Sequence, residues 1–98
     1  MKLPPFDWDD KKAASNLLKH YVSFAEAATV LQNLQAAEFP DAEHSIKENR
    51  WIAIGHSNRG RILVVCYTEK GNVVRIISAR KADKQEKRAY EERKTRGR

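Results

Sequence analysis

Three short apolar segments, separated by two tight-turn sequences, constrain the fold of this 98-residue chain most strongly. The segments are RWIAIGH at 50–56, RILVVCYT at 61–68 and VVRIISA at 73–79. The connections SNRG and EKGN contain the glycine and asparagine that short hairpin turns require. The simplest arrangement is therefore an antiparallel meander of three strands. A weaker strand is predicted at PFDW, residues 5–8, because its proline suits a sheet edge.

Two amphipathic segments precede the meander and one polar segment follows it. A first helix is predicted after Asp9, a possible N-cap, because apolar residues then recur at helical spacing. The pair Ser23 and Glu26 has the spacing of a capping box and predicts the start of a second helix. Asp83 and Glu86 repeat this spacing before a charged helix with almost no apolar face, which we expect to be loosely docked or held by a partner. The predicted fold is α+β, with two N-terminal helices packed on a small antiparallel sheet of about four strands and a C-terminal helix.

The charge of the chain is concentrated near its C-terminus. Residues 1–79 contain ten basic and nine acidic side chains, whereas residues 80–98 contain nine basic and four acidic ones. At this length we expect a single domain over residues 1–98, with a basic helix and tail over about 83–98. Such a basic segment attracts a polyanion such as RNA or an acidic protein, although it would also serve simply to keep the chain in solution.

Other classes of protein are disfavoured by the composition. No apolar run approaches the ~20 residues of a membrane span, and the N-terminal sequence MKLPPFDWDD lacks the apolar segment of a signal peptide. We therefore expect a cytoplasmic protein with no membrane partner. Three histidines and the single Cys66 lie at scattered spacing, so no metal site and no cofactor are predicted.

Several basic side chains are predicted to meet at one edge of the sheet. Arg61 begins one strand and Arg80 follows the end of the next, and an antiparallel pair places these two ends side by side. His56 ends the preceding strand, and Arg59 lies in the connection SNRG that follows it. Guanidinium groups at rigid strand ends suit bidentate contacts to phosphate. Structural ion pairs would explain the same arginines equally well, with the candidate partners Glu38, Glu48 and Glu69.

Four stretches together resemble a known family. They are FDWDDKKAASNLLKHYVSFAEAATV, EFPDAEHS, RWIAIGHSNRGRILVVCYTE and VVRIISARKADKQEKRAYEE, in this order. Over about residues 6–92 they resemble the BrnT toxins of bacterial type II toxin–antitoxin modules. The resemblance implies a RelE-like fold and a metal-independent endoribonuclease that cleaves RNA and so inhibits translation. The implied partner is a BrnA-like ribbon–helix–helix antitoxin, in a hetero-oligomer containing two toxin subunits. The alternative is a non-catalytic basic module that binds an antitoxin or RNA without cleavage.

The resemblance also implies roles for individual residues. The RNA would supply its own 2′-hydroxyl as the nucleophile, while Arg61 and Arg80 clamp the scissile phosphate. His56 would transfer protons, and Tyr90 would contact the substrate or shuttle a proton. Further RNA contacts are assigned to basic residues near the site and on the C-terminal helix, namely Arg59, Lys81, Lys84, Lys87 and Arg88. Arg75 is expected to anchor the sheet through a carboxylate or to contact the antitoxin.

One residue departs from the family pattern. Tyr21 stands at the end of the first predicted helix, where similar proteins usually have glycine. A residue that follows a helix in the left-handed conformation is strained when it carries a Cβ atom, at a cost of about 1 kcal/mol or more. The junction between the two helices is therefore expected to differ from that of the family.

Overall fold

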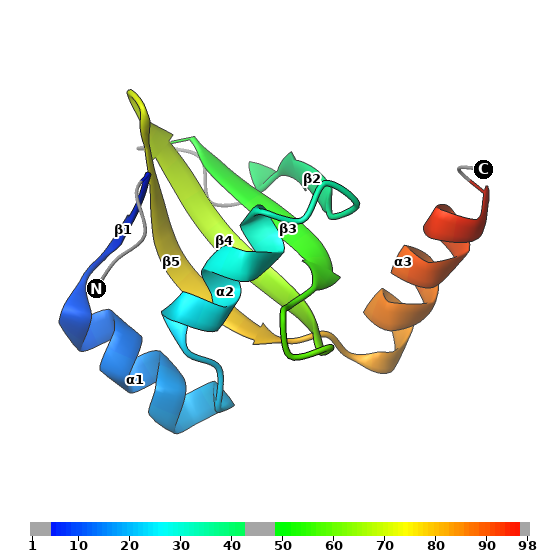
Figure 1. Cartoon of the computed structure of the whole chain (residues 1–98), viewed down its shortest axis with the longest axis horizontal. Coiled ribbons are helices and arrows are strands. Elements are labelled where there is room, and N and C mark those ends of the chain that lie inside the picture. Colours follow the sequence, from blue (N-terminus) through cyan, green and yellow to red (C-terminus); the bar gives the residue numbers. More distant parts are fainter. Residues whose placement is uncertain (1–4, 43–48, 97–98) are drawn as a thin grey trace.

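The computed structural model describes residues 5–42 and 49–96, which form a five-stranded sheet with three helices (Figure 1). The strands run in the order β1-β5-β4-β3-β2 across the sheet. Their bounds are β1 (Phe6–Trp8), β2 (Ala37–Pro40), β3 (Arg50–His56), β4 (Ile62–Lys70) and β5 (Val73–Lys81). The helices are α1 (Asp10–His20), α2 (Phe24–Leu31) and α3 (Lys84–Arg96). The predicted α+β class and the meander of β3, β4 and β5 are confirmed.

The expectation of about four strands in a purely antiparallel sheet is wrong. β1 pairs in parallel with β5, where Phe6 lies opposite Val74, so the sheet is mixed. β2 adds a fifth strand on the other edge, antiparallel to β3. The close approach of the segment before β2 requires Gly55, because a Cβ atom there would lie 2.8 Å from the Cβ of Ala36. The likeness to RelE remains a prediction.

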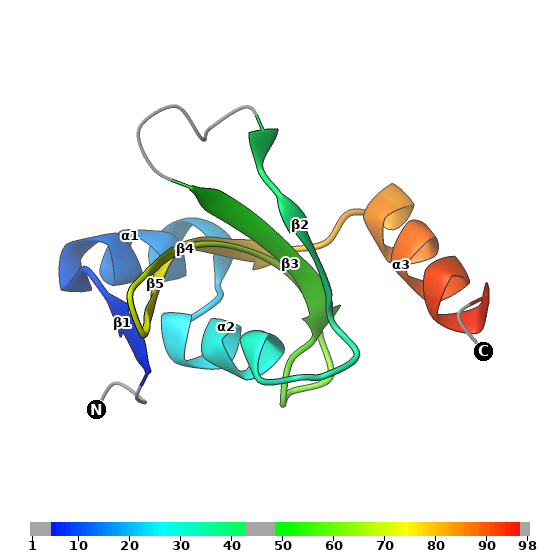
Figure 2. The same cartoon turned by 90° about the horizontal axis from the view of Figure 1, so that it is seen from above.

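α1 and α2 do not cover the sheet equally, which differs from the expectation that both N-terminal helices pack on it (Figures 1 and 2). α2 contacts β3, β4 and β5, whereas α1 contacts β5 and α2. The core between them is formed by buried apolar side chains, among them Val22, Phe24, Val30, Leu63, Val65 and Ile76. The sheet therefore has one face that is packed against α2, and the side chains that alternate with these core residues along β4 lie on the other face.

A buried asparagine fixes α1 to the sheet. The side-chain amide of Asn16 donates to the carbonyl oxygens of Ala79 at 2.8 Å and of Val22 at 2.9 Å. Its side-chain oxygen accepts from the Ala79 backbone N–H at 3.1 Å. Asn16 thus satisfies both backbone groups of one β5 residue, as a neighbouring strand would do.

The edge strand β1 is held by an ion pair. Asp7 lies opposite Arg75 in the register of β1 and β5, and their side chains approach to 2.7 Å. Both side chains are partly exposed, so we expect the pair to position the short strand more than to stabilise the fold. The expectation that Arg75 anchors the sheet through a carboxylate is confirmed.

α3 lies on the opposite side of the molecule from α1 (Figures 1 and 2). Its start is a complete capping box, in which the Glu86 N–H donates to Asp83 at 2.8 Å and the Asp83 N–H donates to Glu86 at 2.9 Å. Tyr90 is buried within the helix and Ala82 just before it, while most of the other side chains over 84–93 are exposed. α3 is thus packed on the rest of the protein mainly through the buried ring of Tyr90, as expected for a loosely docked helix. Among the three helices described, none is long and apolar enough to span a membrane.

Tyr21 adopts the left-handed conformation in spite of the expected strain, with φ 57° and ψ 32°. Its backbone N–H donates to the Leu17 carbonyl at 2.9 Å and closes α1. The ring is largely exposed, so no buried contact of the side chain compensates for the strain.

We expect Tyr21→Gly to stabilise the fold by about 0.5–1 kcal/mol, because glycine relieves the strain at a small cost in unfolded-state entropy. Urea denaturation measures the change. Leu18→Gly is the matched control, since Leu18 is exposed within α1. Glycine there should destabilise the fold by about 1 kcal/mol. A lower denaturation midpoint for Tyr21→Gly would contradict the strain argument.

Candidate functional site

A hollow of about 340 Å³ lies where β3, the β3–β4 turn, the end of β5 and α3 meet. It gathers four of the side chains that the sequence assigns to RNA, and its principal lining residues are His56, Gly60, Arg61, Lys81, Lys87 and Glu91. With three cationic side chains and one carboxylate, this basic hollow is a positively charged cavity at the end of the sheet.

The hairpin of β3 and β4 positions His56 and Arg61. His56 lies opposite Ile62 at the last paired position of β3 and β4. The turn is closed by the Ser57 N–H, which donates to the Arg61 carbonyl at 2.8 Å, and by the Gly60 N–H, which donates to the Ser57 carbonyl at 2.9 Å. Gly60 has φ 79°, a left-handed conformation that glycine adopts without strain. His56 and Arg61 are thereby brought to the two ends of one tight turn.

The imidazole of His56 is held from one side by α3. The rings of His56 and Tyr90 have their centroids 5.7 Å apart at an angle of 59°. Tyr90 is 3% exposed, and its hydroxyl donates a long hydrogen bond of 3.4 Å to the Gln35 carbonyl. Tyr90 therefore supports His56 from behind instead of lining the hollow.

A buried carboxylate fixes Arg61. The Arg61 Nε donates to Oε2 of Glu26 at 3.0 Å, and its Nη2 donates to Oε1 of the same carboxylate. Ser57 donates a further hydrogen bond of 2.7 Å to Glu26, whose side chain is 3% exposed. The hydrogen bonds from Arg61, followed by that from Ser57, outweigh burial and hold the pKa of Glu26 below its usual range.

Arg61 also joins the hairpin to the junction of the two helices. Its Nη2 donates to the backbone carbonyl of Tyr21 at 3.0 Å. Three N–H groups of the guanidinium are thus directed at Glu26 and Tyr21, which leaves the two N–H groups of Nη1 for another acceptor. These contacts hold the side chain in one orientation. The hydrogen bond to Glu26 also raises the pKa of Arg61 further, so the guanidinium keeps its charge.

Sequence reasoning identified Arg61 but missed Glu26 as its partner. Ser23 does cap α2, accepting from the Glu26 N–H at 3.0 Å. The carboxylate, however, turns to Arg61 and does not complete a capping box. The signal was present, since Glu26 is the single charged residue in the otherwise mainly apolar helix FAEAATVL.

Arg80 belongs to a different part of the surface. β5 continues to Lys81, and Arg80 lies opposite Val64, on the face of the sheet away from α2. It borders a second hollow of about 360 Å³, together with Arg50 and Asp41. Arg61 and Arg80 therefore do not meet in one hollow, although both lie toward the same end of the sheet.

The guanidinium of Arg80 is bound by the first turn of α3. Its Nη1 and Nη2 each donate to the Glu86 carboxylate at 2.8 Å. The hydrogen bond from Arg80, followed by the backbone N–H of Asp83, lowers the pKa of Glu86. The partners proposed from the sequence for Arg61 and Arg80 are therefore wrong, since the carboxylates are Glu26 and Glu86; Glu48 lies outside the described residues.

The remaining predicted contacts are on exposed surfaces. Arg59 is in the β3–β4 turn with 71% of its side chain exposed, 3.8 Å from Glu26. Lys84 and Arg88 are exposed on α3, four residues apart and hence on one side of the helix. Neither lines the basic hollow, so these two side chains would extend the positively charged surface from the hollow along α3. Over residues 5–42 and 49–96, no group of three potential metal-ligating side chains is found.

We expect Glu26→Gln to lower the free energy of unfolding at neutral pH by roughly 3 kcal/mol, because it leaves a guanidinium without its carboxylate. The stabilisation by Glu26 is complete above the ordinary glutamate pKa of about 4.3, and it is lost as the pH falls through the lower pKa of the folded state. The variant should therefore lose less stability than the parent protein between about pH 5 and pH 3.

Urea denaturation across this pH range measures the difference. Glu92→Gln, an exposed change on α3, is the control and should leave the pH dependence unaltered. If the free energy of unfolding of Glu26→Gln depends on pH as steeply as that of the parent protein, the ion pair does not stabilise the fold.

Comparisons with known proteins identify the family of the chain. A family model described as "Ribonuclease toxin, BrnT, of type II toxin-antitoxin system" matches residues 8–86. The 1.1 Å crystal structure of the Brucella abortus ribonuclease toxin BrnT is similar, with a TM-score of 0.64 and 29% sequence identity, over 81% of this chain and 96% of that chain. A search of curated proteins gives no match. Because the family match spans most of the sequence, this chain belongs to the BrnT family of ribonuclease toxins of type II toxin–antitoxin systems.

Proposed function

We propose that this chain is an endoribonuclease that cleaves RNA at the basic hollow, inhibits translation and is neutralised by a protein antitoxin. Membership of the BrnT family gives the class of activity. The observation that carries the assignment of the site is the convergence of His56 with Arg61, Lys81 and Lys87 around one cavity. A proton-transfer group beside several phosphate-binding groups is the arrangement that RNA cleavage requires.

The phosphate would be bound by the cationic wall of the hollow. Lys81 and Lys87 approach from β5 and α3, and no ion pair with another described residue engages their ammonium groups. Arg61 is preorganised by Glu26, so that the Nη1 edge of its guanidinium can contact a phosphate oxygen. Fixed donors need little reorganisation as charge develops on the phosphate, and this lowers the barrier.

The nucleophile in this proposal is the 2′-hydroxyl of the RNA. His56 accepts the proton of the 2′-hydroxyl while its oxygen attacks the adjacent phosphorus. The bond from phosphorus to the 5′-oxygen then breaks, leaving a 2′,3′-cyclic phosphate. The 5′-oxygen takes a proton from water, and His56 afterwards returns its own proton to the solvent. No metal ion is needed, since the basic wall stabilises the charge. Tyr90 acts here by positioning His56, and not through its own hydroxyl, which is directed at Gln35.

Arg80 would bind the scissile phosphate only after its ion pair with Glu86 is broken. Its two outer nitrogens are both bound to Glu86, so a phosphate must displace that carboxylate to be clamped. The exposed Arg59, Lys84 and Arg88 would instead guide the RNA backbone toward the hollow. A BrnA-like ribbon–helix–helix antitoxin, in an assembly with two toxin subunits, is the partner that this function implies.

His56→Gln tests the proposed chemistry. The variant should lower the rate of RNA cleavage by about a hundredfold or more, because it removes the proton-transfer group while preserving size and polarity. Cleavage of a fluorescent RNA measures it, with a chelator present throughout. His20→Gln is the matched control, since His20 is exposed at the end of α1, and it should cleave at the normal rate.

Two results would contradict the proposal. Full cleavage by His56→Gln would remove His56 from the chemistry. An RNA that binds to the parent protein and the control but is cut by neither would favour the non-catalytic basic module. Loss of cleavage on adding the chelator would contradict metal independence alone.

A further inference from the structure

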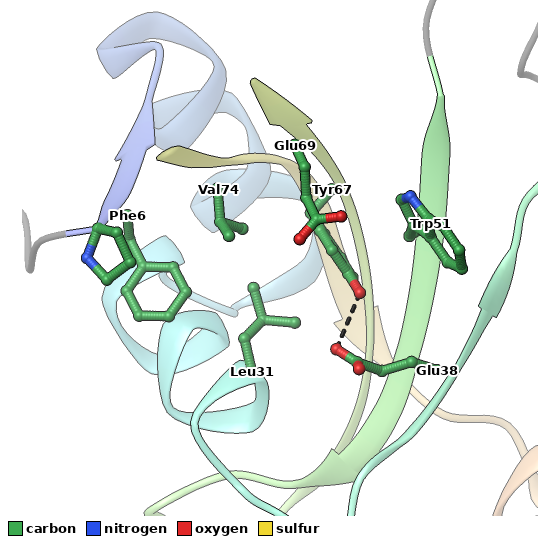
Figure 3. A pocket seen from close by; sticks show the side chains of 8 residues that line it. Phe6, Leu31, Glu38, Trp51, Tyr67, Glu69 and Val74 are labelled. Atoms are coloured by element: carbon green, nitrogen blue, oxygen red, sulfur yellow. Dashed lines mark hydrogen bonds between the residues drawn. The ribbon is translucent and has the colours of Figure 1, made fainter. Parts of the chain in front are cut away.

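A separate hollow of about 390 Å³ lies at the other end of the sheet, on the side covered by α2 (Figure 3). Its walls are mainly apolar and aromatic, formed in part by Phe6, Leu31, Trp51 and Tyr67. Measured along β4, Glu69 at this end and Ile62 beside the basic hollow are roughly 20–25 Å apart. This hollow and the basic hollow are therefore distinct, and the proposed RNA chemistry takes place only in the basic hollow.

The charge of this hollow is opposite to that of the chain as a whole. Among the described residues that line it, the charged ones are two carboxylates, Glu38 and Glu69, and none is a lysine or arginine. The chain carries a net charge of +6. Figure 3 shows both carboxylates close to Tyr67, with Trp51 on the same side and Phe6 across the cavity. A negative cavity in a basic protein disfavours phosphate, and so it does not fit the RNA backbone.

One of the two carboxylates is held in place. The hydroxyl of Tyr67 donates to Oε1 of Glu38 at 2.8 Å, and the tyrosine is 5% exposed. Burial, followed by the hydrogen bond to Glu38, raises the pKa of Tyr67, so its hydroxyl stays protonated at neutral pH and continues to donate. Glu38 is thus oriented by a rigid aromatic residue, while Glu69 extends from β4 beside it.

We propose that this acidic aromatic hollow binds an organic cation, a guanidinium or ammonium group carried on an apolar stem. Glu38 and Glu69 compensate the positive charge, and the faces of Trp51 and Tyr67 offer favourable contacts to a cation. The apolar walls, which include Phe6 and Leu31, accommodate the stem. The cation is supplied either by a free amine or by a basic side chain of a protein partner, and both share this chemistry.

Three small probes test the proposal on the intact chain. N-acetyl-arginine N-methylamide represents a side chain within a protein, and agmatine represents a free amine. N-acetyl-citrulline N-methylamide has nearly the same shape as the arginine probe without its charge. The indole N–H signal of Trp51 in NMR spectra reports binding, and that of Trp8, which packs against Phe24 and does not line the hollow, is the internal control.

The expected result is a saturable shift of the Trp51 signal with the cationic probes and at least about tenfold weaker binding of the citrulline probe. Binding of agmatine alone identifies the source as a free amine, and binding of the arginine probe alone identifies a protein side chain, whereas binding of both supports the cation site for either source. Equal binding of the citrulline and arginine probes would overturn the proposal, as would a shift of Trp51 with neither cation.

Charge-neutralising variants locate the cation. Glu38→Gln combined with Glu69→Gln should weaken binding by about tenfold, since each removes one charge and the new amide at 38 can still accept from Tyr67. Glu92→Gln on α3 removes the same charge elsewhere and should have no effect. Unchanged binding in the double variant would overturn the proposal. Should the Trp8 signal show that the double variant is unfolded, binding to the parent protein must still weaken as salt is raised, and salt-independent binding would overturn it.

Discussion

The ion pair between Glu26 and Arg61 is the interaction on which the basic end of this molecule depends. A carboxylate almost without solvent contact must be compensated, and Arg61 and Ser57 together do so. These contacts join α2 to the β3–β4 turn, and the hydrogen bond from Arg61 to the Tyr21 carbonyl extends the connection to the end of α1. The arginine is therefore rigid before any ligand arrives. Three of its five N–H groups are used in the process, so Arg61 contributes to the hollow as a fixed charge and not as a mobile clamp.

The molecule separates its charges along the strands of the sheet. The hollow beside the β3–β4 turn is lined by Arg61, Lys81 and Lys87, whereas the hollow beside Trp51 is lined by Glu38 and Glu69. A polyanion is thus attracted to one end and repelled from the other. α3 completes the basic end with the buried side chain of Tyr90, which lies against His56. This helix contributes cations to the site, and through Glu86 it also neutralises one of them, Arg80.

Local patterns predicted most of the elements, and long-range contacts account for what was missed. The meander and both N-terminal helices followed from spacing, turn residues and helix-end chemistry. β2 was missed because AEFP is short, mostly exposed and ends in proline, so it has no alternating pattern. The parallel pairing of β1 with β5 joins segments about 70 residues apart and has no local signal. At the site, His56 and Arg61 were correctly expected to be neighbours of one turn. The separation of Arg61 from Arg80 depends on the register of β4 and β5, which pairs Arg80 with Val64 and contains an irregularity at Cys66 and Tyr67 that the sequence pattern did not show.

The central claim is that RNA binds at the basic hollow, and mapping by NMR tests it most directly. An RNA oligonucleotide with 2′-O-methyl groups cannot supply the nucleophile, so it should bind to the ¹⁵N-labelled protein without being cut. Signals of His56, Gly60, Arg61, Lys81 and Lys87 should shift together with one affinity, while those of Trp51 and Glu69 at the far end remain in place. Shifts centred on Trp51 and Glu69, with the signals of the basic hollow unchanged, would show that RNA binds elsewhere.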